Sequence, residues 1–243
     1  MRLPFHPFRP LLRAVAGLPP ATLSVVAACV AVHLMQRIVA AAPVRAVFFG
    51  GADTAYRFEQ DVLSFLFAIS GGSLSLGFFW TPVTYVFLHA GWSHLLLNAL
   101  GLLAFGSALE REAGRGAFFG VFLFAGIVGG AGWALAQGLD SPVPCVGASA
   151  AVLGLAGAFA ALRPRARFAM LLPVPVVLPC WALVAGLFVL NVFELHWVGG
   201  SVAYLAHLLG IVAGVAAGLA LRRRERRRAG AAASPLCQPP PQP

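Results

Sequence analysis

The sequence contains no lysine, and only 10% of its 243 residues carry a charged side chain. A soluble domain of average composition carries roughly a quarter charged residues, so this chain cannot cover a water-facing surface with polar groups. The shortage of charge, together with 60% hydrophobic residues, excludes a soluble enzyme and a disordered tail protein. The apolar runs are long and unbroken instead of alternating, which favours an all-α polytopic membrane protein over a transmembrane β-barrel.

Cysteine is also scarce. Cys29, Cys145, Cys180 and Cys237 are far apart in the sequence and show no paired spacing, so they predict neither a disulfide framework nor a metal site. Cys237 follows the last apolar run and could carry an acyl chain, although a free thiol in a tail is the simpler interpretation.

All 17 basic residues are arginine, and six of them lie in residues 222–228, where only Glu225 interrupts them. This segment directly follows an apolar run. Arginine beside a membrane span is typical of the cytoplasmic side, where it faces anionic lipid. The net charge of +9 therefore indicates membrane lipids as partners, and not nucleic acid.

Six apolar segments are long enough, or nearly so, to cross about 30 Å of hydrocarbon. The first, residues 21–42, is interpreted as a retained helix, with a cleaved signal peptide as the alternative. The other five segments are residues 91–109, 116–137, 147–162, 174–195 and 200–221. Residues 43–80 are too polar to span the membrane and too apolar for a free linker. They predict an interfacial loop with short amphipathic helices.

This pattern divides the chain into three parts. Residues 1–20 form an N-terminal segment, residues 21–221 a six-helix membrane domain, and residues 222–243 a basic and then Ala/Pro-rich tail that we expect to be disordered. Six spans place both termini on one side. If that side is cytoplasmic, fourteen arginines lie inside and three outside, which predicts cytoplasmic termini. The span number fits a bacterial inner membrane.

Four polar side chains stand out within the predicted spans, where an ionisable or strongly polar group is costly and therefore indicates function. They are His94, Asn98, Ser149 and His207. In the predicted topology the second, fourth and sixth spans all run from outside to inside. At a rise of 1.5 Å per residue, each of the four groups lies within roughly 10 Å of the outer end of its span. They can therefore converge at one depth.

Ser149 and His207 suit nucleophilic catalysis. Ser149 follows two prolines and lies in a run of small residues that leaves space around its hydroxyl. Ala206 and Gly210 flank His207 at a spacing of four, so the fourth and sixth spans can pack closely and bring Ser149 Oγ to the imidazole. A serine needs an adjacent base to become a nucleophile, and a desolvated histidine stays neutral, as a base must be.

His94, Asn98 and the Ser149 N–H could supply donors to the oxyanion of acyl transfer. Each group alone has an ordinary structural explanation, because a membrane serine usually bonds its own helix and a lone buried histidine is usually a hydrogen-bonding residue. Their agreement in depth favours catalysis. His89 and His94 are five residues apart with no carboxylate beside them, a poor chelating arrangement, so neither a metal nor a cofactor is predicted.

The same residues resemble the rhomboid family of intramembrane serine proteases, in the family's order, from about Trp80 to Gly214. The matching stretches are residues 84–98, 105–110, 147–150 and 206–210. The resemblance implies a six-transmembrane-helix rhomboid-like bundle with an interfacial loop between helices 1 and 2. It implies Ser149 as nucleophile, His207 as general base, and His94, Asn98 and the Ser149 N–H as the oxyanion hole.

Supporting roles also follow from the resemblance. His89 matches a position that orders the loop and water near the site. Glu110 matches a structural carboxylate that ties the inner end of the second span to neighbouring loops. Gly147 belongs to the implied nucleophile motif, and Ala206 and Gly210 belong to the implied base motif.

The sequence departs from the family pattern at several positions. Ala150 stands where glycine usually follows the nucleophile, and Leu153 stands where an aromatic residue commonly packs on the imidazole. Thr81 replaces an arginine that braces the loop before the second span, and Leu209 replaces a common glycine. None of these changes removes a catalytic atom, so they bear on rate, loop stability and substrate choice.

The activity that the resemblance implies is hydrolysis of peptide bonds in or beside transmembrane segments. The implied substrates are transmembrane proteins, which would enter laterally beside the fifth span. Two alternatives stay open. One is a non-catalytic rhomboid-like protein that binds membrane clients, and the other is a small transporter or channel. The retained Ser149 and His207 argue against the first, and the apolar inner halves of the spans argue against the second.

Overall fold

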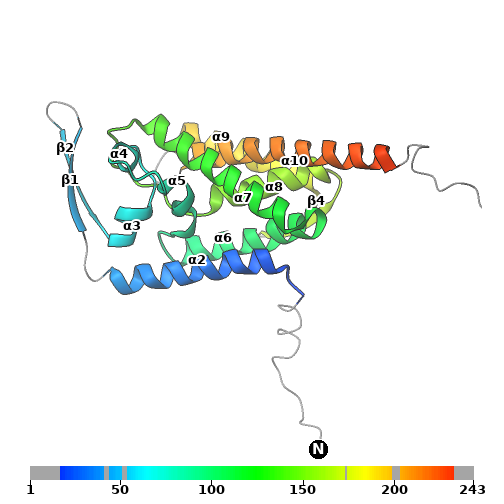
Figure 1. Ribbon diagram of the computed structural model, residues 1–243, viewed down its shortest axis with the longest axis horizontal. Helices are drawn as coiled ribbons and strands as arrows, with labels where there is room; N and C mark the ends of the chain where they lie inside the picture. The colour runs from blue at the N-terminus through cyan, green and yellow to red at the C-terminus, as the bar shows by residue number, and fades with distance from the viewer. Residues whose placement is uncertain (1–16, 41–43, 51–53, 173, 199–202, 233–243) are drawn as a thin grey trace, which may run out of the picture.

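The computed structural model describes residues 17–40, 44–50, 54–172, 174–198 and 203–232, and this part of the chain is mainly helical. Figure 1 shows the long helices running side by side, with a β-hairpin projecting at one end. Four helical stretches are long and apolar enough to cross a membrane: Pro20–Val39, Trp92–Gln137, Cys180–Trp197 and Tyr204–Gly230. The chain is therefore an integral membrane protein with a mainly helical fold, as predicted.

The elements follow one another along the chain as a series of helices with two inserted hairpins. The helices are α2 (Pro20–Val39), α3 (Val62–Phe67), α4 (Gly71–Ser75), α5 (Thr81–Thr84), α6 (Trp92–Gly101), α7 (Ser107–Gln137), α8 (Ser149–Leu162), α9 (Cys180–Phe193) and α10 (Tyr204–Ala232). The antiparallel hairpins are β1 (Val44–Gly50) with β2 (Thr54–Gln60), and β3 (Arg167–Leu172) with β4 (Val174–Pro179).

α6 and α7 form one helical stretch that contains a π-helical turn at Leu102–Gly106 and changes direction at Gly114. Gly114 has a φ of +84°, a left-handed conformation that interrupts the helix. The chain reverses direction there. As a result, Gly106 and Phe118, on opposite sides of Gly114, lie close together, and a side-chain carbon at Gly106 would lie only 2.9 Å from the ring of Phe118. The stretch thus contains two helical segments, one on either side of Gly114.

The backbones of α8 and α10 pack directly against each other. Gly210, Gly214 and Gly218 recur every four residues on α10, and a side-chain carbon at any of them would collide with the backbone of α8. Small residues at this spacing are what permits such an approach in membranes. The close contact predicted from Ala206 and Gly210 is therefore present, and it sets the distance between the beginning of α8 and the first turns of α10.

Glu110 ties the beginning of α2 to α7. Its carboxylate accepts hydrogen bonds from the backbone N–H groups of Ala21 (3.0 Å) and Thr22 (2.7 Å) and from the Thr22 hydroxyl (2.9 Å). N–H groups in a first helical turn have no acceptor within the helix, and a negative charge is favourable there. α2 also buries Val25 and Cys29 in the core.

Two stretches of the chain differ from the prediction. Residues 43–80, expected to form an interfacial loop with short amphipathic helices, also contain the hairpin β1–β2, in which Val44 lies opposite Gln60. The aromatic and β-branched residues of this hairpin suit strands. The prediction that the fifth span begins at residue 174 is wrong, because β4 ends at Pro179 and α9 begins at Cys180. Pro175 and Pro179 cannot continue a helix, which explains the late start.

The arginine segment is helical, since α10 continues to Ala232 and extends beyond the predicted end of the membrane domain at residue 221. Residues 1–16 and 233–243, which include Cys237 and the ends of both predicted terminal segments, lie outside the described residues.

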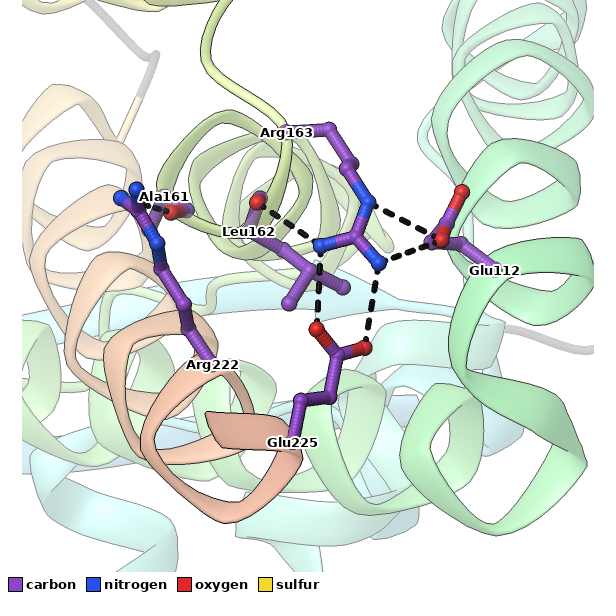
Figure 2. Close-up of polar contacts among 6 residues, drawn as sticks. All are labelled: Glu112, Ala161, Leu162, Arg163, Arg222 and Glu225. Carbon is purple, nitrogen blue, oxygen red and sulfur yellow. Dashed lines mark hydrogen bonds and ion pairs between the residues drawn. The ribbon is translucent and has the colours of Figure 1, made fainter. Parts of the chain in front are cut away.

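Arg163 joins three helices at the end of α8 that is remote from Ser149 (Figure 2). Its guanidinium lies 2.7 Å from the Glu112 carboxylate of α7 and forms two hydrogen bonds, at 3.0 and 3.2 Å, with Glu225 of α10. Nearby, Arg222 donates to the carbonyl of Ala161 at 3.4 Å. Arg163 contacts both carboxylate oxygens of Glu225, which is the strongest geometry for such a pair, but the three charged side chains are partly exposed to solvent. We therefore expect these ion pairs to contribute about 1 kcal/mol or less to stability.

Candidate active site

Ser149 is the first residue of α8, at the end of a non-helical approach. A hydrogen bond from the Gly147 N–H to the Tyr85 carbonyl, at 3.0 Å, fixes the position of this segment. Gly147 has a φ of +115°, in the left-handed region that glycine adopts most readily. N–H groups in the first turn of a helix have no partner within it and produce a positive potential. The Ser149 hydroxyl and N–H therefore both lie at the positive end of α8.

His207, in the first turn of α10, contacts Ser149 directly, since its Nε2 lies 2.7 Å from Ser149 Oγ. Small neighbours allow this approach. A side-chain carbon at Gly129 of α7 would lie 2.7 Å from the Ala206 carbonyl oxygen, and one at Gly210 would collide with the backbone of Ala150. The contact that the sequence predicted between the fourth and sixth spans is present, and it joins α8 to α10 at the predicted pair.

Asn191 reaches the same imidazole from α9. Its Oδ1 lies 2.8 Å from His207 Nδ1, and the residue is only 5% exposed. Its Nδ2 donates to the Leu187 carbonyl at 2.8 Å. Asn191 was not among the polar groups selected from the sequence, although the rule that selected Asn98, a strongly polar group within a span, applies to it equally.

His94 lies against the turn that precedes Ser149. A side-chain carbon at Gly147 would come within 2.5 Å of His94 Cε1 and 2.7 Å of its Nε2, so the ring occupies the space beside that glycine. Asn98 is buried one turn further along α6, and its Nδ2 donates to the His94 carbonyl at 2.9 Å. Because a side-chain amide carries two hydrogens, this bond leaves Asn98 one more to donate.

His89 supports this region from the loop before α6. Its N–H donates to Gln36 Oε1 of α2 at 3.0 Å, and its ring centroid lies 5.2 Å from that of His94. The Gln36 side chain also donates to Ser64 Oγ at 3.2 Å, which links α2 to α3. Burial, together with the neighbouring His94, lowers the pKa of His89 to about 4, so its ring is neutral at pH 7.

The departures from the family pattern have local compensations. The additional methyl group of Ala150 faces Gly129, where a side-chain carbon would lie only 2.7 Å from it, so glycine there makes room for the methyl. Leu153 packs against the core, and the ring next to His207 is that of Tyr204, edge-on at 6.2 Å.

The segment before α6 is braced by neutral groups. Thr81 is fully buried and donates to the Phe78 carbonyl at 2.8 Å. The Trp80 indole N–H and the Thr84 hydroxyl donate to two carbonyl groups at the end of α3, at 2.7 and 2.9 Å. These hydrogen bonds hold the segment in place without the arginine that the resemblance leads one to expect at position 81.

Within the described ranges, no cluster of three or more His, Cys, Asp or Glu side chains is arranged to hold a metal ion. The described cysteines, Cys29, Cys145 and Cys180, are buried free thiols. The groups that the structure brings together at the beginning of α8 are thus the Ser149 hydroxyl, the His207 imidazole that contacts it and the His94 ring beside Gly147. The His207 imidazole is placed to remove a proton from the serine hydroxyl.

Comparison with known proteins identifies the family of this chain. The family model described as "Rhomboid domain" matches residues 76–224, more than half of the chain. The chain belongs to the rhomboid family. The rhomboid match includes Ser149, His207 and each of the other residues that the motifs singled out.

Two rhomboid relatives come from Bacillus subtilis (strain 168). "Rhomboid protease GluP" is 36% identical over 144 residues, which cover 51% of this chain and 28% of that protein. "Putative rhomboid protease YdcA" is 40% identical over 83 residues, which cover 34% of this chain and 41% of that protein. The alignments therefore cover less than half the length of either relative.

Proposed function

We propose that this rhomboid-family protein is an intramembrane serine protease that hydrolyses peptide bonds in or next to transmembrane segments of other membrane proteins. One observation carries the proposal, namely the 2.7 Å contact between Ser149 Oγ and His207 Nε2 at the N-terminus of α8. A serine hydroxyl that donates to a neutral imidazole is the arrangement that activates a serine nucleophile. The names of the two relatives support the same activity.

In the proposed reaction, Ser149 Oγ attacks the carbonyl carbon of the scissile bond while its proton passes to His207 Nε2. The carbonyl oxygen becomes an oxyanion, which accepts hydrogen bonds from the Ser149 N–H and from the His94 and Asn98 side chains. The imidazolium then gives its proton to the leaving nitrogen, the C–N bond breaks, and an acyl group remains on Ser149. Water attacks this acyl carbon and gives a proton to His207, which returns it to Ser149 Oγ as the carboxyl product leaves.

The proposed topology has six membrane crossings, with both termini in the cytoplasm of a bacterium and the reacting groups near the outer face of the inner membrane. The six are α2, the two segments of the α6–α7 stretch on either side of Gly114, α8, α9 and α10. This topology places Arg163 and the arginines of α10 on the cytoplasmic side, in agreement with the positive-inside rule. The segment from residue 43 to α6 is then the interfacial loop, at the depth of Ser149.

The proposed substrates are transmembrane proteins whose helix can unwind near the outer face. A helical carbonyl is already hydrogen-bonded, so it must be freed before Ser149 can attack it. We therefore expect a preference for substrates with glycine or proline near that face and with a small residue before the cut. Entry beside α9 fits this proposal, since the exposed side chains of α9, such as Val189 and Phe193, are apolar.

Cleavage of a transmembrane substrate by the purified protein in detergent tests the proposal. We expect Ser149→Ala and His207→Ala to abolish cleavage. Ser24→Ala is a matched control, because the Ser24 hydroxyl donates to the Ala21 carbonyl in its own helix, at 2.7 Å, and its loss should leave cleavage unchanged. Cleavage that persists at the wild-type rate in Ser149→Ala would refute the assignment.

A serine-reactive fluorophosphonate probe separates this proposal from a client-binding rhomboid without catalysis. Labelling that needs both Ser149 and His207 is expected of the protease. A chain that binds membrane clients without any labelling of Ser149 would be the non-catalytic alternative.

A further inference from the structure

Asn191 lies near the C-terminal end of α9, a helix whose other side chains are almost all apolar. A buried amide in such a helix is costly unless its donor and its acceptor both find partners. Both partners are present. Nδ2 donates to the Leu187 carbonyl one turn earlier, and Oδ1 lies 2.8 Å from His207 Nδ1. Asn191 therefore forms one hydrogen bond within α9 and one with the imidazole that contacts Ser149.

The bond to Leu187 determines which way the amide points. A carbonyl can only accept, so the NH₂ end of Asn191 must face Leu187 and the oxygen end must face His207. An amide oxygen can likewise only accept, so Nδ1 of His207 must carry the ring's proton. The lone pair of the neutral imidazole then lies on Nε2, 2.7 Å from the Ser149 hydroxyl. One hydrogen bond from α9 thus selects the tautomer in which His207 can act as a base.

We propose, on the basis of the protease function above, that Asn191 is a positioning residue that completes a Ser149–His207–Asn191 chain across α8, α10 and α9. It holds the imidazole in the reactive tautomer and in line with Ser149 Oγ, and its amide oxygen faces the positive charge that forms on the ring during reaction. A neutral amide does this without the desolvation cost of a carboxylate inside a membrane. A group that orients a catalytic histidine in this way acts through the histidine and touches no substrate.

The test compares two variants of similar size in the cleavage assay. Asn191→Leu keeps the volume and removes the acceptor. Asn191→Asp keeps the acceptor, and in its protonated form it can also donate to the Leu187 carbonyl as the amide does. We expect Asn191→Leu to lower kcat by roughly 10- to 100-fold, with KM within twofold of wild type, and Asn191→Asp to recover most of that loss. Leu219→Ala, at a 43% exposed position twelve residues along α10 from His207, should leave kcat unchanged.

A packing role predicts the reverse order, because leucine preserves packing and aspartate does not. The inference is overturned if Asn191→Leu keeps kcat within twofold of wild type, or if Asn191→Asp is as slow as Asn191→Leu. Should Asn191→Leu not accumulate as a folded protein, Asn191→Ala carries the same expectation, with folding checked by thermal melting. Failure of the proposed function looks different, because wild type and Ser149→Ala would then not differ in cleavage.

Discussion

One Glu110 carboxylate oxygen lies 2.7 Å from the Thr22 backbone nitrogen and 2.9 Å from the Thr22 hydroxyl. The other accepts from the Ala21 N–H, so one buried side chain of α7 satisfies three donors at the beginning of α2. The residues lie 88 positions apart in the sequence. Glu110 thereby fixes where the first helix docks against the rest of the bundle.

Removing this carboxylate should destabilise the protein without touching the reacting groups. Glu110→Ala leaves three buried donors without an acceptor, and we expect it to lower the free energy of unfolding by about 2–3 kcal/mol. Thermal or denaturant unfolding in detergent measures the change. Asp140→Asn, which alters an exposed acidic residue, is the control and should have little effect. A Glu110→Ala protein as stable as wild type would show that the three bonds contribute nothing.

Gly147 should be intolerant of even one methyl group. Alanine there must adopt a φ of +115°, and its Cβ would lie 2.5 Å from His94 Cε1, so the His94 ring or the turn before Ser149 has to move. A displacement of about 1 Å at a reacting group can cost roughly 100-fold in rate, and we expect Gly147→Ala to lose cleavage by that order.

A matched control for Gly147 is available in α7. A side-chain carbon at Gly116 meets nothing within 4 Å, so Gly116→Ala should leave the rate unchanged. Wild-type kcat in Gly147→Ala would mean that neither the turn nor the position of His94 matters to the reaction.

His89 should make stability depend on pH below neutrality. Its pKa in the folded protein is about 4, against an ordinary value of 6.5, because burial disfavours the charged ring. Between these values the unfolded chain binds a proton at this position and the folded protein does not. Stability therefore falls as the pH drops from 6.5 towards 4, by on the order of 2–3 kcal/mol, and this loss is absent above pH 6.5.

Unfolding of wild type and His89→Gln between pH 7.5 and pH 4.5 measures this contribution. The variant should lose less stability on acidification than wild type, whereas His196→Gln, at an exposed position, should follow wild type. Parallel pH profiles for wild type and His89→Gln would contradict the assignment of the acid sensitivity to His89.

Hydropathy and composition were sufficient to identify an integral membrane protein, and small-residue spacing was sufficient to predict that the spans bearing Ser149 and His207 approach each other. Those are properties of single helices, namely their apolar length, the face that a residue occupies and the size of its neighbours. For the same reason the four intramembrane polar groups could be selected one by one from the printed sequence.

Apart from Ser149 and His207, the sequence alone did not show which side chains meet across helices. That Asn191 bonds His207, that Glu110 bonds the beginning of α2, and that His94 rests on Gly147 depend on how each helix is rotated and where it crosses its neighbour. The hairpins at β1–β2 and β3–β4 were likewise missed, because an apolar run with prolines or aromatic residues is locally compatible with either helix or strand. Sequence determined the chemistry available within the membrane, and tertiary packing decided which of those groups touch.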